Sequence, residues 1–245
     1  MIYSVLGWIY ETLLCSIEQR KFINRGFLNG PYCPIYGCGA IVDILFLHEI
    51  ENTVFLFFAG VLLTCSLEYL TSWVMEKLFR ARWWDYSDRK FNINGRVCLL
   101  GAVVFGTFSV VLIKFIHPFI FSYTSKIPFS TLHFLSFSLF VVFSADCVHT
   151  ITNFAGFAHK LQELNGYIDN AVKTANRYKA AIIDRINESE IYEKISMAYE
   201  SFGKKINNQE RRMLLSFPKL KSTRYDKILQ ELKENIKKIK GVDKK

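Results

Sequence analysis

The sequence lacks the patterns of several common functional sites. Its six cysteines are scattered, and no Cys-x-x-Cys pair or Cys/His cluster has the spacing of a zinc site. We therefore predict no metal, no disulfide and no other cofactor. The chain also has no Walker A string, Gly-x-x-x-x-Gly-Lys-Ser/Thr, so it cannot itself supply an ATPase. No Ser/His/Asp or Cys/His constellation is recognisable either, which makes an enzyme the less favoured class.

Net charge is almost absent from the first part of the chain. Residues 1–154 hold 11 Lys+Arg and 10 Asp+Glu, whereas residues 155–245 hold 20 and 12, and the whole chain carries a formal charge of +9. This shift predicts a transmembrane domain over residues 1–153. A basic cytoplasmic helical tail is predicted over residues 154–245.

Long apolar runs fill the neutral part of the chain. A helix needs roughly 17–25 mostly apolar residues to cross a bilayer. The candidate spans cover residues 1–17, 32–47, 53–75, 97–116 and 129–148. So many apolar segments leave too few polar residues to cover a soluble fold. We predict an all-α polytopic membrane helix bundle of about five spans.

The charges of the short loops predict how the spans are oriented. Lys and Arg gather in the loops after the first and third spans, and the loop after the second span has glutamates and no Lys or Arg. Basic loops stay in the cytoplasm. The N-terminus is therefore expected outside and the tail inside.

Two glutamates occupy matching places in the first and third spans. Glu11 and Glu68 each precede a serine, a second glutamate and a basic loop that ends in Asn-Gly-x-x-Cys. This layout predicts a parallel repeat of residues 7–40 and 64–102, with coincidence as the alternative. An ionised carboxylate in a bilayer costs several kcal/mol and usually marks a pathway or site inside the bundle. The alternative is a structural glutamate paired with a loop arginine, and the lone Asp43 and Asp146 rank lower.

The two inner loops hold most of the remaining candidate residues. Glycines permit close backbone approach, prolines fit a helix start, and arginines would pair with the glutamates or clamp an anionic group. An aromatic belt with positive anchors is the alternative. With Glu11 and Glu68, the predicted substrate-binding or pathway residues are Trp8, Asn24, Arg25, Gly26, Asn29, Gly30, Pro31, Cys33, Pro34, Tyr36, Gly37, Arg82, Trp83, Trp84, Asp85, Tyr86, Asn94, Gly95 and Arg96.

Several long strings occur in order along residues 4–110. They are Gly7-Trp8-Ile9-Tyr10-Glu11 and the segments Asn24–Ala40, Leu67–Phe79, Arg82–Ser87 and Phe91–Cys98. In these strings the chain resembles a bacterial membrane family known as putative ABC-transporter type IV, or putative ABC transporter permease. The resemblance implies a multi-pass protein of the bacterial plasma membrane and a permease subunit. It does not supply a substrate.

The tail has the periodicity of packed helices. Apolar residues recur every three or four positions from Leu161 to Ile182 and again from Ile191 to Ile206, which predicts a hairpin with a break at residues 187–190. A last helix combines the apolar Ile228, Leu229, Leu232, Ile236 and Ile239 with the basic Lys233, Lys237, Lys238 and Lys240. Such a helix would lie on anionic lipid or dock a partner, and the alternative is a solvated helical arm with no specific ligand. Nucleic acid is not an expected partner, because aromatic platforms and a fold signature are missing.

Three functions fit these observations. The favoured one is a permease-like transport subunit that binds a polar or anionic solute near the cytoplasmic face, in a cavity lined by Glu11, Glu68, Trp8 and loop arginines. A separate ATPase would energise it, and a homodimer is expected by analogy with half-size permeases. The first alternative is a membrane-embedded enzyme acting on a lipid headgroup. The second is an assembly or regulatory factor acting through its tail.

Overall fold

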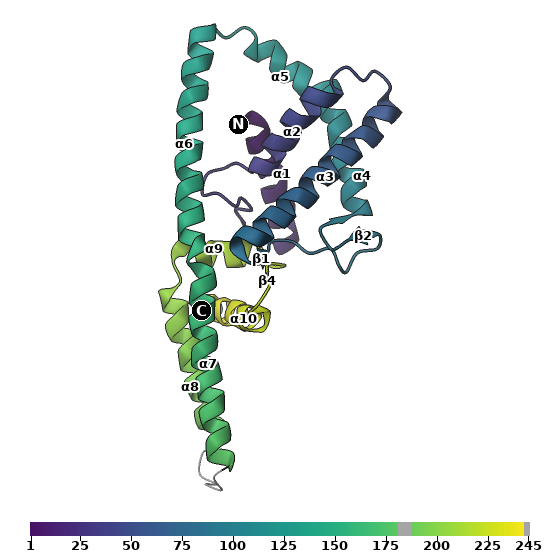
Figure 1. The fold of residues 1–245 in the computed structure, drawn as a ribbon. Coiled ribbons are helices and arrows are strands. Elements are labelled where there is room, and N and C mark those ends of the chain that lie inside the picture. Colours follow the sequence, from purple (N-terminus) through teal and green to yellow (C-terminus); the bar gives the residue numbers. More distant parts are fainter. Residues whose placement is uncertain (181–187, 243–245) are drawn as a thin grey trace. The chain divides into compact units, whose positions relative to one another are not determined.

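The computed structural model describes the backbone of residues 1–180 and 188–242, which is mostly helical with very short strands (Figure 1). This confirms the predicted all-α class. In chain order the elements are α1 Ile2–Gln19, α2 Pro34–Leu47, α3 Thr53–Phe79, β1 Ala81–Arg82, β2 Asn92–Ile93, β3 Val97–Cys98, α4 Leu99–Val111, the π-helix η1 Leu112–Ile116, α5 His117–Thr124, α6 Phe129–Ala155, α7 Phe157–Ala180, α8 Glu188–Lys205, α9 Asn208–Ser216, β4 Lys221–Ser222 and α10 Asp226–Val242.

The chain forms two compact units. The first unit consists of residues 1–77 and 83–150, and the second of residues 78–82 and 151–245. Residues 78–82 belong to the second unit because β1, which lies among them, pairs antiparallel with β4 of the C-terminal region. Each unit is described by itself below.

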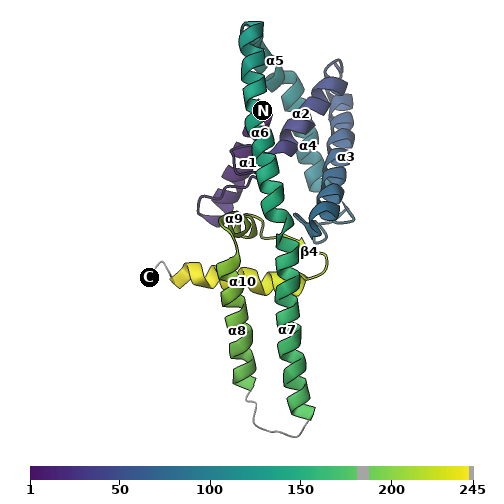
Figure 2. The same cartoon turned by 60° about the vertical axis from the view of Figure 1, so that its left-hand side comes forward.

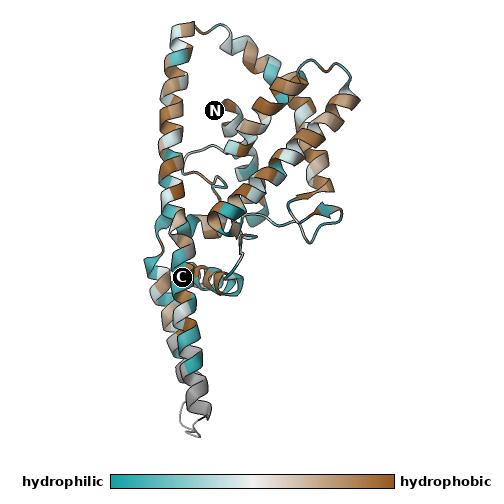
Figure 3. Ribbon diagram, viewed as in Figure 1, coloured by the Kyte–Doolittle hydropathy of each residue, from teal (hydrophilic) through white to brown (hydrophobic). Residues whose placement is uncertain are grey.

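Three helices in the described part of the chain are long and apolar enough to cross a membrane. They are Thr53–Phe79, Leu99–Thr124 and Phe129–Asn170, and Figure 3 shows the apolar residues distributed along them. α2 is apolar, but its 14 residues extend only about 21 Å, less than a bilayer core of about 30 Å. α1 carries Glu11 and Glu18 within its 18 residues. The count of five spans and their orientation stay predictions.

Small residues allow the helices of the first unit to approach closely. A Cβ atom on Gly37 of α2 would lie 2.0 Å from the Ser4 Oγ of α1, and one on Gly60 of α3 would lie 2.5 Å from the Ser109 Cβ of α4. Gly and Ser at such contacts are typical of helix pairs in membranes, where packing replaces the hydrophobic effect. α1 and α2 therefore form a tight pair, and α3 and α4 approach closely at Gly60 and Ser109.

The second membrane-length helix, Leu99–Thr124, changes its winding in the middle. η1 connects α4 to α5 without a break, and Pro118 follows one residue after it. Proline has no N–H to donate and its ring displaces the carbonyl four residues before it, which is that of Lys114 within η1. The side chain of Lys114 makes a separate contact: its ammonium donates to the carbonyls of Ile50 and Glu51, at 3.2 and 3.0 Å. Short π segments often occur at functional sites.

The second unit is built on a helical hairpin. α7 and α8 run side by side in Figures 1 and 2, and α10 packs against both of them. The hairpin is the arrangement that the apolar periodicity predicts, although α8 already begins at Glu188. The predicted break at residues 187–190 is therefore wrong over residues 188–190, while Asn187 and Ile182 lie outside the described residues.

The apolar face of α10 is covered inside this unit. Leu229, Leu232 and Ile236 are buried, as are Leu164 of α7 and Phe202 of α8. Lys233, which the sequence assigns to a lipid-facing or partner-facing surface, is 5% exposed and donates to the carbonyls of Pro218 and Leu220. That assignment of Lys233 is wrong, because the packing of α10 on the hairpin uses the same apolar stripe. The side chains of Ile239, Lys237, Lys238 and Lys240 lie outside those described.

A buried ion pair fixes the start of α9. Glu210 is fully buried, and its carboxylate accepts two hydrogen bonds from the Lys160 ammonium at 2.9 Å. The same carboxylate accepts from the Asn207 N–H, and the Asn207 side chain accepts from the Glu210 N–H, which forms a capping box. These contacts join α9 to α7 within the second unit.

Candidate functional site

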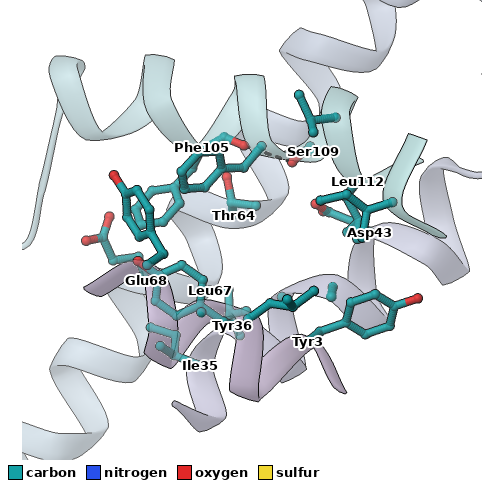
Figure 4. Close-up of a pocket in the computed structure, with 18 residues that line it drawn as sticks. Tyr3, Ile35, Tyr36, Asp43, Thr64, Leu67, Glu68, Phe105, Ser109 and Leu112 are labelled. Atoms are coloured by element: carbon teal, nitrogen blue, oxygen red, sulfur yellow. Dashed lines mark hydrogen bonds between the residues drawn. The ribbon is translucent and has the colours of Figure 1, made fainter. Parts of the chain in front are cut away.

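The first unit contains a partly open cavity of about 300 Å³. Residues of α1, α2, α3, α4 and η1 line it, and Figure 4 shows their side chains converging on the same space. Most of the wall is apolar or aromatic, with Leu6, Ile35, Leu67, Phe105, Phe108 and Leu112 among its members. A volume of this size lies at the lower end of the range of small-molecule sites.

Glu68 of α3 lies in the wall of this cavity, and its functional role stays a prediction. It is 5% exposed, and its Oε1 accepts a hydrogen bond from the Tyr86 hydroxyl at 3.3 Å. Within the described residues, its Oε2 has no hydrogen-bond partner. A buried carboxylate oxygen without a donor is unfavourable unless a proton or a cation reaches it.

Asp43 of α2 is a second cavity carboxylate, which the sequence ranked lower. It is 3% exposed, Ser109 lies beside it, and its Oδ1 has no hydrogen-bond partner in the described part of the chain. The signal was present in the helical spacing: Tyr36, Gly39, Ala40 and Asp43 recur every three or four residues and all line the cavity. Asp43 therefore belongs to a stripe of α2 that faces the cavity.

Glu11 does not line the cavity. Its Oε1 accepts a hydrogen bond from the Tyr36 hydroxyl at 2.7 Å, and its Oε2 lies 3.5 Å from the Arg25 Nε. Tyr36 itself does line the cavity, so it connects Glu11 to the site. The pairing with a loop arginine is the structural alternative for this glutamate. Trp8 is also outside the lining and donates to the Asn24 Oδ1 at 2.8 Å, which accepts from the Gly26 N–H as well.

The loop between α3 and α4 makes contacts within itself and with the end of α3. Arg96 donates to the Ser72 hydroxyl at 3.1 Å, lies 2.9 Å from Glu76, and stacks over the Tyr69 ring. The Trp84 indole donates to the Arg96 carbonyl, and the Tyr86 N–H to the Gly95 carbonyl. Arg96 is therefore paired with residues at the end of α3 and not with Glu68.

The Asn-Gly of the second loop forms a tight turn between β2 and β3. Asn94 and Gly95 both have positive φ, at 53° and 67°, and the Arg96 N–H donates to the Ile93 carbonyl. This is a type I′ hairpin turn, for which Asn-Gly is the preferred pair.

Three other predicted site residues of this loop, Arg82, Trp83 and Asp85, have contacts outside the cavity. Trp83 is buried against Phe27, edge to face. Asp85 accepts hydrogen bonds from the backbone and hydroxyl of Ser87. Arg82 belongs to β1 of the second unit. None of these three side chains lines the cavity.

The loop between α1 and α2 is hydrogen-bonded to Asp146 of α6. The Asp146 carboxylate accepts from the Asn29 N–H and side-chain amide at 3.2 and 3.1 Å, from the Gly30 N–H at 2.8 Å and from the Tyr32 hydroxyl at 2.7 Å. The sequence gave Asp146 no role, because nothing in its neighbourhood indicates a partner more than a hundred residues away.

The helix starts after the two loops correspond. Cys33 is the N-cap of α2 and Cys98 the N-cap of α4, so both Asn-Gly-x-x-Cys strings end where a helix begins. Pro34 occupies the first turn of α2, as expected of a proline at a helix start. Pro31 lies between Gly30 and Tyr32, and Gly37 provides the close contact with Ser4. The predicted repeat is not otherwise tested.

Tyr86 shows that the two glutamates share a neighbourhood. Burial raises the pKa of its phenol, and the nearby charges of Glu68 and Glu11 raise this pKa further. A tyrosine so placed stays protonated and serves as a hydrogen-bond donor. No group of three or more His, Cys, Asp or Glu residues suited to a metal ion occurs in the described part of the chain.

Three helices of membrane-spanning length in the described part of the chain indicate a membrane protein, and its first unit contains a cavity with buried carboxylates. A family model described as putative ABC-transporter type IV matches residues 1–151, and the chain belongs to that family. This confirms the resemblance found in residues 4–110 and extends it through the last predicted span. Comparison with curated proteins gave no match, and comparison with solved structures gave none.

Proposed function

We propose that the chain is the membrane subunit of an ABC-type transport system and that its first unit binds a small polar solute in the cavity. The observation that carries the proposal is the cavity itself, a partly open space of about 300 Å³ with two buried carboxylates among apolar helices. Intramembrane ionisable residues that face a cavity mark substrate or ion pathways. Membership of the family supports transport over other roles.

The proposed site differs from the one expected from the sequence. Glu68 and Tyr36 are the members of the expected set that line the cavity, joined by Asp43. The loop arginines are engaged elsewhere, Arg25 with Glu11 and Arg96 with Glu76. The residues lining the cavity include no Lys, Arg or His in the described part of the chain. A polar solute is therefore favoured over an anionic one.

The energy source and the setting are part of the same proposal. The sequence has no Walker A string, so active transport requires a separate ATPase. Residues such as Phe134, Phe137 and Phe140 of α6 are strongly exposed, which suits contact with membrane lipids or with a second copy of the chain. We place the protein in a bacterial plasma membrane, with the basic second unit in the cytoplasm and a homodimer as its working form.

Inverted membrane vesicles from the source cell test this proposal. The native gene is deleted, and the full chain is supplied as wild type, as Glu68→Gln or as Glu49→Gln. Vesicles are given a filtered cell extract with or without ATP, and the solutes inside and outside are compared by mass spectrometry. Glu49 is the matched control because it is an exposed glutamate in the α2–α3 loop of the same unit.

Transport predicts at least one solute whose distribution changes with ATP in wild-type and Glu49→Gln vesicles and not in Glu68→Gln vesicles. Identical solute profiles with and without the protein would overturn the proposal. Turnover of a lipid headgroup by the purified protein in detergent, without ATP, would replace it with the enzyme alternative.

A further inference from the structure

The cavity has the chemistry of a cation site. We propose that it binds a small organic cation, a protonated amine or quaternary ammonium, whose charge meets Glu68 and Asp43 and whose carbon skeleton packs on the aromatic wall. This inference names the substrate class of the proposed transport function and therefore rests on that function for its physiological meaning.

The first argument is the unbalanced charge. Glu68 and Asp43 are at least 95% buried, and each has one oxygen without a hydrogen-bond partner among the described residues. Figure 4 shows the two side chains on opposite sides of the cavity. A buried carboxylate requires a compensating charge, a proton or donors for its lone pairs. A cation bound in the cavity can supply this compensation.

The second argument is that nearby protein cations are committed to other groups. Arg25 lies against Glu11, Arg96 against Glu76, and Lys114 donates to the carbonyls of Ile50 and Glu51. No positively charged side chain lines the cavity in the part of the chain that the structure describes. An anionic ligand would meet hydroxyl groups such as those of Thr64 and Ser109, but no positively charged side chain among the described lining residues.

The third argument is the composition of the wall. Tyr3, Tyr10, Tyr36, Phe105 and Phe108 bring aromatic rings to the cavity. The face of an aromatic ring attracts cations, and a set of such rings is the usual recognition element for quaternary ammonium groups. A bare metal ion is a poorer fit, because carbon-rich walls offer it few oxygen ligands and the described residues contain no metal-binding cluster.

The cavity also limits the size and kind of the ligand. Gly39 of α2 faces Leu67 of α3, and Asp43 lies one helical turn, about 6 Å, further along α2. A small cation can therefore lie near one carboxylate and extend toward the other. A lipid headgroup would bring a phosphate that finds no basic residue in the wall. A free cation is thus favoured over a phospholipid.

Calorimetric titration of the full chain in detergent tests the inference without requiring transport. The probes are choline, tetraethylammonium and putrescine, together with the uncharged carbon isostere of choline and a short-chain phosphatidylcholine. We expect at least one free cation to bind and the uncharged isostere not to bind. Glu68→Gln and Asp43→Asn should each weaken cation binding about tenfold or more, because each removes one compensating charge. Glu49→Gln should leave the affinity unchanged.

Each result decides the matter in one direction. Failure of all three cations to bind the wild-type chain overturns the inference, as does equal binding of choline and its uncharged isostere. Binding of phosphatidylcholine alone also overturns it, because the ligand is then a lipid. The folded state of each variant is checked by size-exclusion chromatography, and Asp43→Asn serves as the second variant if Glu68→Gln does not fold. Cation binding without ATP-dependent transport would refute the proposed function and leave the inference standing, whereas transport of an anion or uncharged solute would do the reverse.

Discussion

The contact between Asp146 and the loop before α2 offers a sharp test of how the first unit is held together. We expect Asp146→Asn to release residues 29–32 from α6. The substitution keeps the size of the side chain but replaces one charged acceptor oxygen with an amide donor. The Gly30 N–H and the Tyr32 hydroxyl, at 2.8 and 2.7 Å from Oδ2, would then face an N–H group instead of an oxygen, or would share the one that remains.

The size of the effect follows from the bonds that change. Hydrogen bonds to charged groups contribute about 1.5–3 kcal/mol each. Two such bonds give roughly 3–6 kcal/mol, and the half-buried position of Asp146 reduces this to about 2–3 kcal/mol because water can replace part of the loss. Since 1.4 kcal/mol is a factor of ten, the local opening equilibrium should rise about 30- to 150-fold.

Hydrogen exchange of the full chain in lipid nanodiscs measures this directly. The amides of Asn29 and Gly30 should exchange faster by that factor in Asp146→Asn. The matched control is Asp169→Asn, which alters an exposed carboxylate on α7 that accepts from Asn165. Unchanged exchange at Asn29 and Gly30, or an equal change in the control, would refute the conclusion that Asp146 holds the loop before α2.

Two further predictions follow from other buried contacts. Glu210→Gln should destabilise α9 by about 2–3 kcal/mol, because it breaks the ion pair with Lys160, and hydrogen exchange across α9 checks this against the exposed control Glu200→Gln. Gly37→Ala should separate α1 from α2 by overpacking against Ser4 at a cost of about 1–3 kcal/mol, measured as a lower melting temperature in detergent. Recovery of that temperature by the added change Ser4→Gly would support the contact, and no loss in Gly37→Ala would contradict it.

Local pattern was enough to predict most of the helices, and it singled out Glu68, which lies in the cavity wall. The apolar runs reproduce α2 and α3 closely, and the Asn-Gly-x-x-Cys strings correctly place the starts of α2 and α4. The spacing of Asp43 with Tyr36, Gly39 and Ala40 already placed it on one stripe of α2, but pattern gave no sign of what Asp146 contacts. The contacts of Asp146 come from a loop far away in sequence.

Lys233 illustrates the same limit in the second unit. A basic amphipathic helix has one sequence pattern, whether its apolar stripe lies on lipid or on other helices. In the structure the stripe packs on the hairpin, and Lys233 donates to backbone carbonyls. Only the tertiary packing separates these outcomes.

Glu11 and Glu68 make the strongest test of how sequence and structure relate, because their sequence surroundings match and their partners differ. Glu11 lies 3.5 Å from Arg25, whereas Glu68 lies in the cavity wall with one oxygen unpartnered among the described residues. Removing one member of a partly buried ion pair leaves the other uncompensated, so Glu11→Gln should cost about 1–2 kcal/mol. The double variant Glu11→Gln/Arg25→Gln should lose less stability than the sum of the losses in Glu11→Gln and in Arg25→Gln. Glu68→Gln removes a buried charge with no protein counterion and should leave stability unchanged or raise it by about 1 kcal/mol. Thermal unfolding of the four variants in ligand-free detergent decides the matter: equal destabilisation by Glu11→Gln and Glu68→Gln would mean that both glutamates are structural.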